Sequence, residues 1–540
     1  VRFQKILFCG IFKIHYMNTL SPDFQKLLSD CADTYTKNAL KEAPTGTTIS
    51  IHALTARAAT VYEKVRYLVD YKDEHVIRRS AIERILKRIL FIENKQEAGK
   101  ALLHELVSGR YLPNDTIPES EAVAIQAIID VFRPCLSTIK ASLRLTHTEQ
   151  VIFTVLASEV EAHLFPDAID EYLSNAFFAY LKPRIQYDGD LSPEAFDTQL
   201  FIACRKGLLK SDDGDLRYQL FCRMLGIAPR QFNAEALTFA RPRYAEVVAR
   251  IDDALSEPIG ASLLGRIKNH AIYFYFIREI IIRHKTGAGE IVSDTARLDE
   301  AVRTALTEKY EIENTKLKRS GTRAILYILA TKVLLALPFE ALYEWYIIKS
   351  VHYTPLAINL LFHPSLLFLL TRNIKPLGDD NTARVIAGIH EVISGDASKP
   401  IVIRAKESGT LQFLFSALYI ALFALSFGLL IWLLTALSFN PVSIIFFVLF
   451  VALVSYFGLR IRHNAERWRV YVNNDKVWPL FWNSLTLPVV RLGMWLTRTF
   501  SAINVFVFVM DFLVESSFKI ILKVFDSFLT FLKDKKEETY

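Results

Sequence analysis

An uncharged apolar stretch near the C-terminus constrains the fold more than any other feature of the chain. Residues 411–459 contain no Asp, Glu, Lys, Arg or His, and Leu, Ile, Phe and Val predominate. Each of these four residue types favours insertion at the centre of a membrane helix by about 0.3–0.6 kcal/mol. A soluble core very rarely accommodates so long an uncharged segment, so a buried hairpin in a soluble protein is the less favoured interpretation. The stretch predicts an integral membrane protein.

Two helices joined by a tight turn fit this stretch. The first, 411–438, would be ~42 Å long and the second, 442–459, ~27 Å, against a hydrocarbon core of ~30 Å. Between them stand Phe439, Asn440 and Pro441. Asn is a good N-cap and Pro a good first helical residue, so we expect a transmembrane hairpin whose second helix begins at the proline.

The charges that flank the hairpin indicate its orientation. Basic residues precede the first helix and follow the second, whereas the intervening turn has none. They are Lys399, Arg404 and Lys406 on one flank, and Arg460, Arg462, Arg467 and Arg469 on the other. The positive-inside bias then predicts that the N-terminal and C-terminal regions are both cytoplasmic.

Residues 17–320 are predicted to form a soluble, all-α domain. Gly and Pro number only 20 and 19 in the chain, which argues against a turn-rich β fold. Apolar residues recur at helical spacing, for example from Ile82 to Leu90, and alternation typical of strands is not convincing. Helix starts are marked by N-terminal signals at Pro118, Asp167, Ser192 and Asn233.

The first 16 residues carry a weaker signal. Arg2 and Lys5 precede a short apolar run, as in a signal peptide, but Lys13 interrupts the run and no small-residue cleavage site follows. Met17 stands just before a helix start at Ser21. We expect residues 1–16 to be a dispensable leader from an upstream start, and the folded part to begin near Met17.

Residues 321–400 form an apolar helical region whose membrane placement stays open. Two apolar runs, 324–338 and 355–371, have a length that suits a buried core helix, a re-entrant segment or a crossing. Lys332 interrupts the first run and His363 the second. A snorkelling lysine and a helix break at the proline after His363 are favoured, and the alternative is that both side chains line an intramembrane polar cavity.

The C-terminal region, 460–540, is predicted to be amphipathic and membrane-associated. Along residues 500–533, four charged residues recur at every fourth position and share one helix face, in the series Asp511, Glu515, Lys519 and Lys523. An interfacial helix in the headgroup plane is favoured, and packing on the hairpin, a homo-oligomer with a polar interior and a further crossing stay open. Residues typical of interfacial anchors lie upstream, namely Trp478, Trp482, Arg491, Trp495 and Arg498.

The sequence does not support a catalytic, metal or cofactor site. The HExxH, GxSxG and GxxxxGK[ST] patterns are absent. Glu159 and His163 share a helix face and could hold a metal, but no second pair is evident, so separate partners are favoured. The five cysteines show no metal or disulfide spacing and are expected to be reduced and mostly buried: Cys9, Cys31, Cys135, Cys204 and Cys222.

These patterns favour a membrane-anchored helical interaction or scaffold protein. Its expected partners are the lipid bilayer and a protein bound by the cytoplasmic domain, and self-association stays open. A component of a membrane transporter or channel is the alternative, favoured by the charged stripe and by Lys332 and His363. A membrane enzyme comes third. The net charge of +7 is small for a chain of 540 residues, so a nucleic-acid binder is not predicted.

Overall fold

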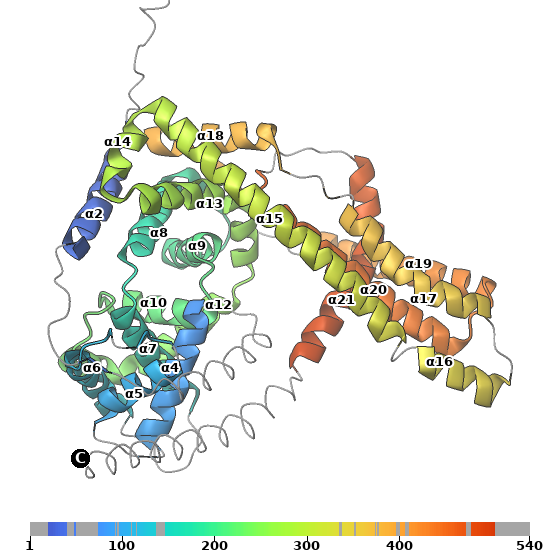
Figure 1. Ribbon diagram of the computed structural model, residues 1–540, viewed down its shortest axis with the longest axis horizontal. Helices are drawn as coiled ribbons and strands as arrows, with labels where there is room; N and C mark the ends of the chain where they lie inside the picture. The colour runs from blue at the N-terminus through green and yellow to red at the C-terminus, as the bar shows by residue number, and fades with distance from the viewer. Residues whose placement is uncertain are drawn as a thin grey trace, which may run out of the picture. The chain divides into compact units, whose positions relative to one another are not determined.

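The described part of the chain is mostly helical with almost no sheet, which confirms the all-α prediction (Figure 1). The computed structural model describes residues 20–39, 48–49, 74–91, 93, 97–109, 111–114, 116–136, 146–333, 337–349, 353–372, 374, 377–395, 400–404, 410–470 and 477–502. Its contacts define two compact units. We call them the N-terminal unit, Thr19–Glu290 with Ile393–Ile403, and the apolar unit, Ile291–Val392 with Arg404–Asn504.

The described part of the N-terminal unit is mainly helical. Its α-helices are α2 (Pro22–Ala39), α4 (Glu74–Phe91), α5 (Ala98–Ser108), α6 (Ser120–Leu136), α7 (His147–Leu164), α8 (Ala168–Leu181), α9 (Pro193–Leu208), α10 (Asp213–Leu225), α11 (Ala234–Ala240), α12 (Tyr244–Ser256), α13 (Ile259–His284) and, across the division, α14 (Ala288–Ser293). Three short 3-10 helices are η1 (Lys182–Arg184), η2 (Arg241–Arg243) and η3 (Lys285–Gly287). Strands β1 (Ile185–Asp188) and β2 (Ile401–Arg404) pair as a small sheet that the sequence did not predict.

Local capping signals in this unit are confirmed. The side chains of Asp167, Ser192 and Asn233 each accept a main-chain hydrogen bond at the start of α8, α9 and α11. Such caps satisfy N–H groups that have no partner within the helix, which is why they mark helix starts. Of the apolar residues predicted on α4, Ile82, Ile85, Leu86 and Ile89 are buried and Leu90 is partly buried.

The described cysteines agree with the prediction of reduced, buried thiols. Cys31, Cys135, Cys204 and Cys222 are free and buried, whereas Cys9 lies outside the described residues. Burial, reinforced by Asp30, raises the pKa of Cys31 to about 12. A thiol that stays protonated in this way is a poor nucleophile and metal ligand.

The apolar unit contains the long helices of the C-terminal half. They are α15 (Thr295–Thr331), α16 (Leu337–Tyr343), the π-helical turn η5 (Glu344–Ile348), α17 (Tyr353–Arg372), α18 (Asp379–Ser394), α19 (Thr410–Ala436), α20 (Pro441–Ala465) and α21 (Val477–Ala502). Three of these segments are long and apolar enough to span a membrane: α17, residues 416–436 of α19, and α20. The boundary expected at residue 320 falls inside α15.

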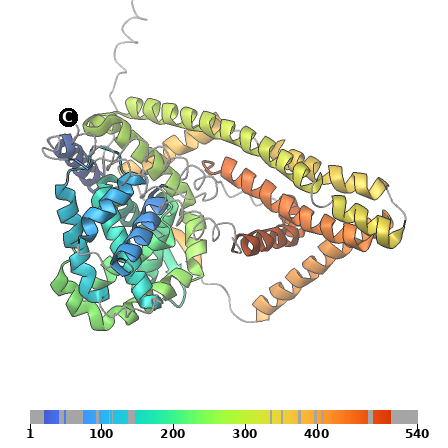
Figure 2. The same cartoon turned by 60° about the horizontal axis from the view of Figure 1, so that its bottom comes forward.

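The predicted turn between the two hairpin helices is confirmed. Helix α20 begins at Pro441, and the Asn440 side chain caps it by accepting from the main-chain nitrogen of Ser443 at 2.8 Å. From this turn α19 and α20 diverge, and α21 packs against both of them (Figure 2). A Cβ added at Gly493 of α21 would overlap the carbonyl oxygen of Ala452 in α20, so only glycine permits this close approach.

Asn381 of α18 connects two other parts of the apolar unit, α15 and the segment after α20. Its side-chain nitrogen donates to the Tyr310 hydroxyl of α15 at 2.7 Å and to the main-chain oxygen of Trp468 at 2.9 Å. Its side-chain oxygen accepts from the main-chain nitrogen of Val470 at 2.8 Å. The segment after α20 is thereby held on α15 and α18.

Candidate functional site

Lys332 and His363 lie in one buried polar cluster of the apolar unit. Lys332 caps the C-terminal end of α15 and is 2% exposed, while His363 lies within α17 and is 0% exposed. Both contact Asn359, one turn before His363. Lys332 therefore does not reach the surface of this unit. The helix break predicted after His363 is wrong, because α17 continues through Pro364.

Asn359 is the centre of the cluster. The Lys332 ammonium donates to the main-chain oxygen of Asn359 at 2.9 Å and also to its side-chain oxygen. Nδ1 of His363 lies 3.0 Å from the same main-chain oxygen, and Nε2 lies 3.1 Å from the main-chain oxygen of Phe447 in α20. Because both partners are carbonyl oxygens, only the doubly protonated imidazolium can donate to both, and the neutral ring donates to one.

Two carboxylates that the sequence analysis missed complete the cluster. Glu340 of α16 accepts from the Asn359 amide at 2.5 Å and from the Ser443 hydroxyl of α20 at 3.3 Å. Glu344 of η5 accepts from the Asn440 amide at 2.8 Å. Both glutamates are at most 2% exposed. The two glutamates are four residues apart within an apolar region, which puts them on one helical face. This spacing is the sequence feature that could have indicated them.

The cluster combines one ammonium and two carboxylates within aromatic surroundings. The Lys332 nitrogen lies 4.7 Å from the ring centre of Phe450, and the His363 and Phe447 ring centres are 4.7 Å apart. Its hydrogen bonds join α15, α16, α17 and α20. A network that is bonded in this way fixes the arrangement of its helices.

The predicted charged stripe lies outside the described residues. This applies to all four of its members, Asp511, Glu515, Lys519 and Lys523, so its placement stays a prediction. The side chains of three predicted interfacial anchors are described on α21, namely Arg491, Trp495 and Arg498. Trp495 is exposed, and the Arg491 guanidinium lies 4.9 Å from the ring centre of Tyr419 in α19. Arg491 thus contacts the predicted hairpin.

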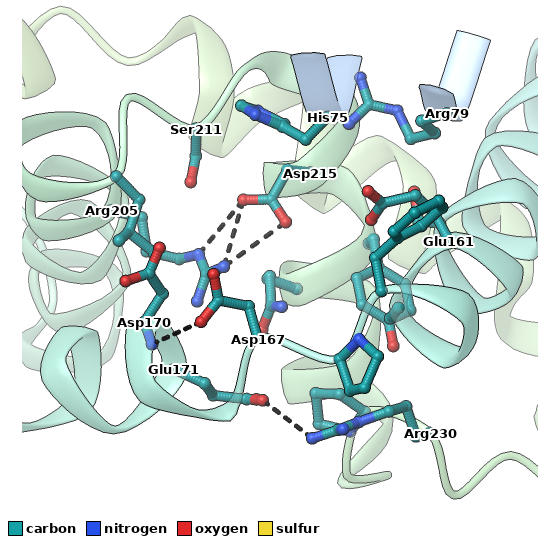
Figure 3. A pocket seen from close by; sticks show the side chains of 18 of the residues that line it. His75, Arg79, Glu161, Asp167, Asp170, Glu171, Arg205, Ser211, Asp215 and Arg230 are labelled. Atoms are coloured by element: carbon teal, nitrogen blue, oxygen red, sulfur yellow. Dashed lines mark hydrogen bonds and ion pairs between the residues drawn. The ribbon is translucent and has the colours of Figure 1, made fainter. Parts of the chain in front are cut away.

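A second candidate site is a charged cavity in the N-terminal unit (Figure 3). Its volume is about 660 Å³, and α4, α7, α8, α9, α10 and α13 contribute to its walls. Its charged lining comprises five arginines and five carboxylates: Arg78, Arg79, Arg205, Arg230, Arg278, Glu161, Asp167, Asp170, Glu171 and Asp215. The sequence analysis missed this site because its residues come from six different helices and the loop after α10.

The arginines of the cavity pair with carboxylates from other elements. Figure 3 shows Arg205 facing Asp215, at 3.2 Å, and Arg230 facing Glu171, at 3.5 Å. The remaining pairs are Arg78 with Glu161 at 3.4 Å, Arg278 with Asp170 and, at 4.0 Å, with Asp167, and Arg79 with Asp212, which lies outside the lining. Guanidinium groups held by carboxylates are preorganised, because less side-chain freedom remains to be lost on binding.

Glu159 lies behind one wall of the cavity. It accepts from the Tyr218 hydroxyl at 2.6 Å and from the main-chain nitrogen of Arg230 at 3.2 Å. Burial raises the pKa of Glu159, although both hydrogen bonds act in the opposite direction. Burial likewise raises the pKa of Glu161, against the charge of Arg78. These carboxyl groups therefore hold a proton at higher pH than usual.

The pKa values of two aspartates in this region are shifted in opposite directions. Burial, and then the neighbouring charge of Asp170, raises the pKa of Asp167. Burial also acts to raise the pKa of Asp212, but the hydrogen bond and charge of Arg79 outweigh it, so the Asp212 pKa lies below its ordinary value. The protonated form of Asp167, which lines the cavity, is therefore favoured more than usual, whereas Asp212, which lies outside the lining, stays ionised to lower pH than usual.

Glu159 and His163 do not form a metal pair. Nε2 of His163 lies 2.9 Å from the Glu121 carboxylate, whereas Glu159 points to Tyr218. Within the described ranges, no three His, Cys, Asp or Glu side chains come together as metal ligands.

Searched against known protein families, curated proteins and solved structures, the chain matches none of them.

Proposed function

We propose that this protein is a membrane-anchored binding protein. The apolar unit holds the chain in a lipid bilayer, and the N-terminal unit, on the cytoplasmic side, binds a segment of a partner protein. The placement on that side is supported by the basic residues that flank 411–459. The partner segment carries charges of both signs, because it enters the charged cavity.

Exposed apolar side chains support the anchoring role. Helix α19 exposes large apolar residues along its whole length, including Phe413, Leu418, Leu425 and Trp432. Soluble monomers rarely expose apolar patches of this extent, whereas a lipid-facing helix does so by necessity. Together with α17 and α20, α19 supplies the multi-pass anchor that we propose.

The balanced charge of the cavity is the observation that carries the binding role. A volume of about 660 Å³ is ample for several side chains of a bound segment. Five arginines and five carboxylates line it, so the formal charge of these ten groups sums to zero. A ligand of one sign would separate ion pairs and leave one member uncompensated, whereas a mixed-charge segment can replace both members of a pair.

A peptide panel tests this binding role on the full chain in lipid nanodiscs. Three fluorescent peptides of equal length are compared: alternating Glu and Lys, Glu alone, and Lys alone. We expect the mixed peptide to bind at least ~10-fold more tightly than either of the others, a difference of ~1.4 kcal/mol. Fluorescence anisotropy measures the three dissociation constants.

Two double variants locate the binding. Arg205→Gln with Asp215→Asn neutralises one cavity pair and should abolish the preference. The matched control, Glu246→Gln with Arg250→Gln, neutralises an exposed pair on α12 and should retain it. The proposal is contradicted if the three peptides bind equally well, or if the cavity variant keeps the preference for the mixed peptide.

Transport is a second candidate function, and the buried cluster of Lys332, Glu340 and His363 favours it. Ionisable groups within apolar helices are costly, and transporters retain them in proton or ion pathways. Proton or ion flux through the purified chain in liposomes tests this candidate. Flux that disappears in Lys332→Met would favour transport. If liposomes that contain the wild-type chain show no more flux than liposomes without protein, transport of the tested ions is excluded.

A further inference from the structure

The segment formed by α16 and η5 has one polar buried face and one apolar exposed face. Glu340 and Glu344 lie on the buried face. Trp345 is 70% exposed and Tyr346 is 72% exposed, and Leu342 and Ile347 are also exposed. A soluble helix shows the reverse arrangement, with its carboxylates in water and its aromatic rings inside. The exposed face therefore needs an apolar or amphipathic environment.

The buried face fixes where this segment lies within the apolar unit. Glu344 accepts from Asn440, which is the N-cap of α20, and Glu340 accepts from Ser443 in the first turn of α20. Both partners lie at the turn between α19 and α20. The segment therefore lies at the same end of the unit as this turn, as Figure 1 shows for α16.

Helices α15 and α17, which precede and follow the segment, run antiparallel. Gly321 of α15 faces Thr371 near the end of α17, and Ile328 packs with Leu367. Further along, Lys332 bonds to Asn359. The order of these contacts shows a second helical hairpin, 321–372, with α16 and η5 in its bend. Its α17 arm is 20 residues long, or ~30 Å, which equals the thickness of the hydrocarbon core.

Several exposed amphipathic rings lie at this same end. Trp345 and Tyr346 lie in the bend, Tyr353 begins α17, and Trp432 lies in the last turns of α19 before the hairpin turn. All four are well exposed, whereas the middle of α19 exposes aliphatic and Phe side chains instead. Trp and Tyr concentrate at the level of lipid headgroups, because one part of the ring is apolar and another forms hydrogen bonds.

We propose that α16 and η5 lie in the headgroup region of the leaflet on the side of the α19–α20 turn, with Trp345 and Tyr346 against lipid. Residues 321–372 then cross the bilayer as a second hairpin. The buried contacts of Glu340 and Glu344 hold the bend on α17 and α20 and keep both carboxylates out of the lipid. The inference rests on the anchoring part of the proposed function.

Side-specific labelling tests the second hairpin and separates it from the first. Single cysteines are placed in the full chain without its native cysteines: Ser438→Cys in the α19–α20 turn, Lys349→Cys after η5 and Asp380→Cys on α18. All three positions are exposed. A membrane-impermeant maleimide is applied to sealed vesicles. We expect Ser438→Cys and Lys349→Cys to react on one side, and Asp380→Cys on the other.

The other possible labelling results distinguish failure of the second hairpin from failure of the anchoring hairpin. If Lys349→Cys reacts on the side of Asp380→Cys while Ser438→Cys stays opposite, the second hairpin is overturned and the anchor stands. If Ser438→Cys reacts on the side of Asp380→Cys, the anchoring hairpin fails and the inference fails with it.

Fluorescence quenching tests the depth of the bend. In a chain with Trp345 as its single tryptophan, bromine near the lipid headgroup should quench about 2-fold more than bromine near the chain end, as expected of an interfacial ring. Leu425→Trp, in the middle of α19 and in a chain without its other tryptophans, should show the reverse order. Trp345 fluorescence that no brominated lipid quenches would overturn the proposal and indicate a protein, or a second copy of the chain, on this face.

Discussion

The ammonium nitrogen of Lys332 lies 2.9 Å from the main-chain oxygen of Asn359 and also donates to that residue's side-chain oxygen. Asn359 in turn donates to Glu340, so one amide connects a cation and a carboxylate that stand on different helices. In an apolar setting such a connection is stable only while both charges are present, since each alone would lack compensation. The stability of the apolar unit should therefore depend on the two charges together.

Removal of one charge should cost more than removal of both. Lys332→Met alone leaves the buried glutamates uncompensated, and we expect a loss of ~3–5 kcal/mol in the free energy of unfolding. Lys332→Met with Glu340→Gln should lose less. Lys316→Met, at an exposed lysine of α15, is the control and should change little. Thermal unfolding of the detergent-solubilised chain measures all three, and equal losses for the single and double variants would argue against coupling.

The close contact between α20 and α21 requires glycine at position 493. Gly493→Ala would place a Cβ against the carbonyl oxygen of Ala452, so the helices must separate, at a cost of ~1–3 kcal/mol. Gly428→Ala on α19 is the matched control, because its added Cβ meets no atom within 4 Å. We expect only Gly493→Ala to lower the melting temperature and expose α21 to protease. Equal effects at both glycines would refute this close packing.

Glu159 should reduce stability increasingly as the pH rises. Its pKa in the folded state is raised by burial, so the stability it contributes is complete below the unfolded pKa and is lost as pH rises through the folded pKa. Gln keeps the acceptor for Tyr218 but does not titrate. Between pH ~4 and ~8, the melting temperature of Glu159→Gln should increase relative to wild type. Glu246→Gln, at an exposed glutamate, should show no such trend.

Asp212 should show the opposite dependence on pH. Its pKa is lowered because Arg79 outweighs the effect of burial, so its contribution is present above the unfolded pKa, ~3.9, and is lost as pH falls through the folded pKa. Asp212→Asn retains the N-cap of α10 but not the charge. We expect wild type to melt above this variant at neutral pH and the difference to shrink in acid. A difference that stays constant with pH would rule out the titration of Asp212 as its source.

Local features of this fold were predictable from the sequence. Asn440 with Pro441 predicted the start of α20, and Ser192 with Pro193 that of α9, because a cap and its first turn involve only adjacent residues. The uncharged run 411–459 predicted two long apolar helices, because its composition is likewise a property of one continuous segment. The start of α15 and its continuation past residue 320 were not foreseen, since an unbroken helix shows no change in period where its surroundings change.

The candidate sites were predictable only in part. Lys332 and His363 stood out because each interrupts an apolar run, but their meeting at Asn359 depends on how α15 and α17 pack. Glu340 was missed although it lies near these runs. The cavity gave no signal, since Arg278 and Asp170 are 108 residues apart and charged residues are ordinary on the exposed faces of helices.

The most direct test of the account compares the two units across a membrane. Ser438→Cys, in the exposed turn between α19 and α20, and Lys26→Cys, on α2 of the N-terminal unit, are each placed in the full chain without other cysteines. A membrane-impermeant maleimide is applied to sealed vesicles of known orientation. The account predicts that Lys26→Cys reacts only from the cytoplasmic side and Ser438→Cys only from the opposite side. Reaction of both cysteines from one side of intact vesicles would contradict the proposed membrane anchor.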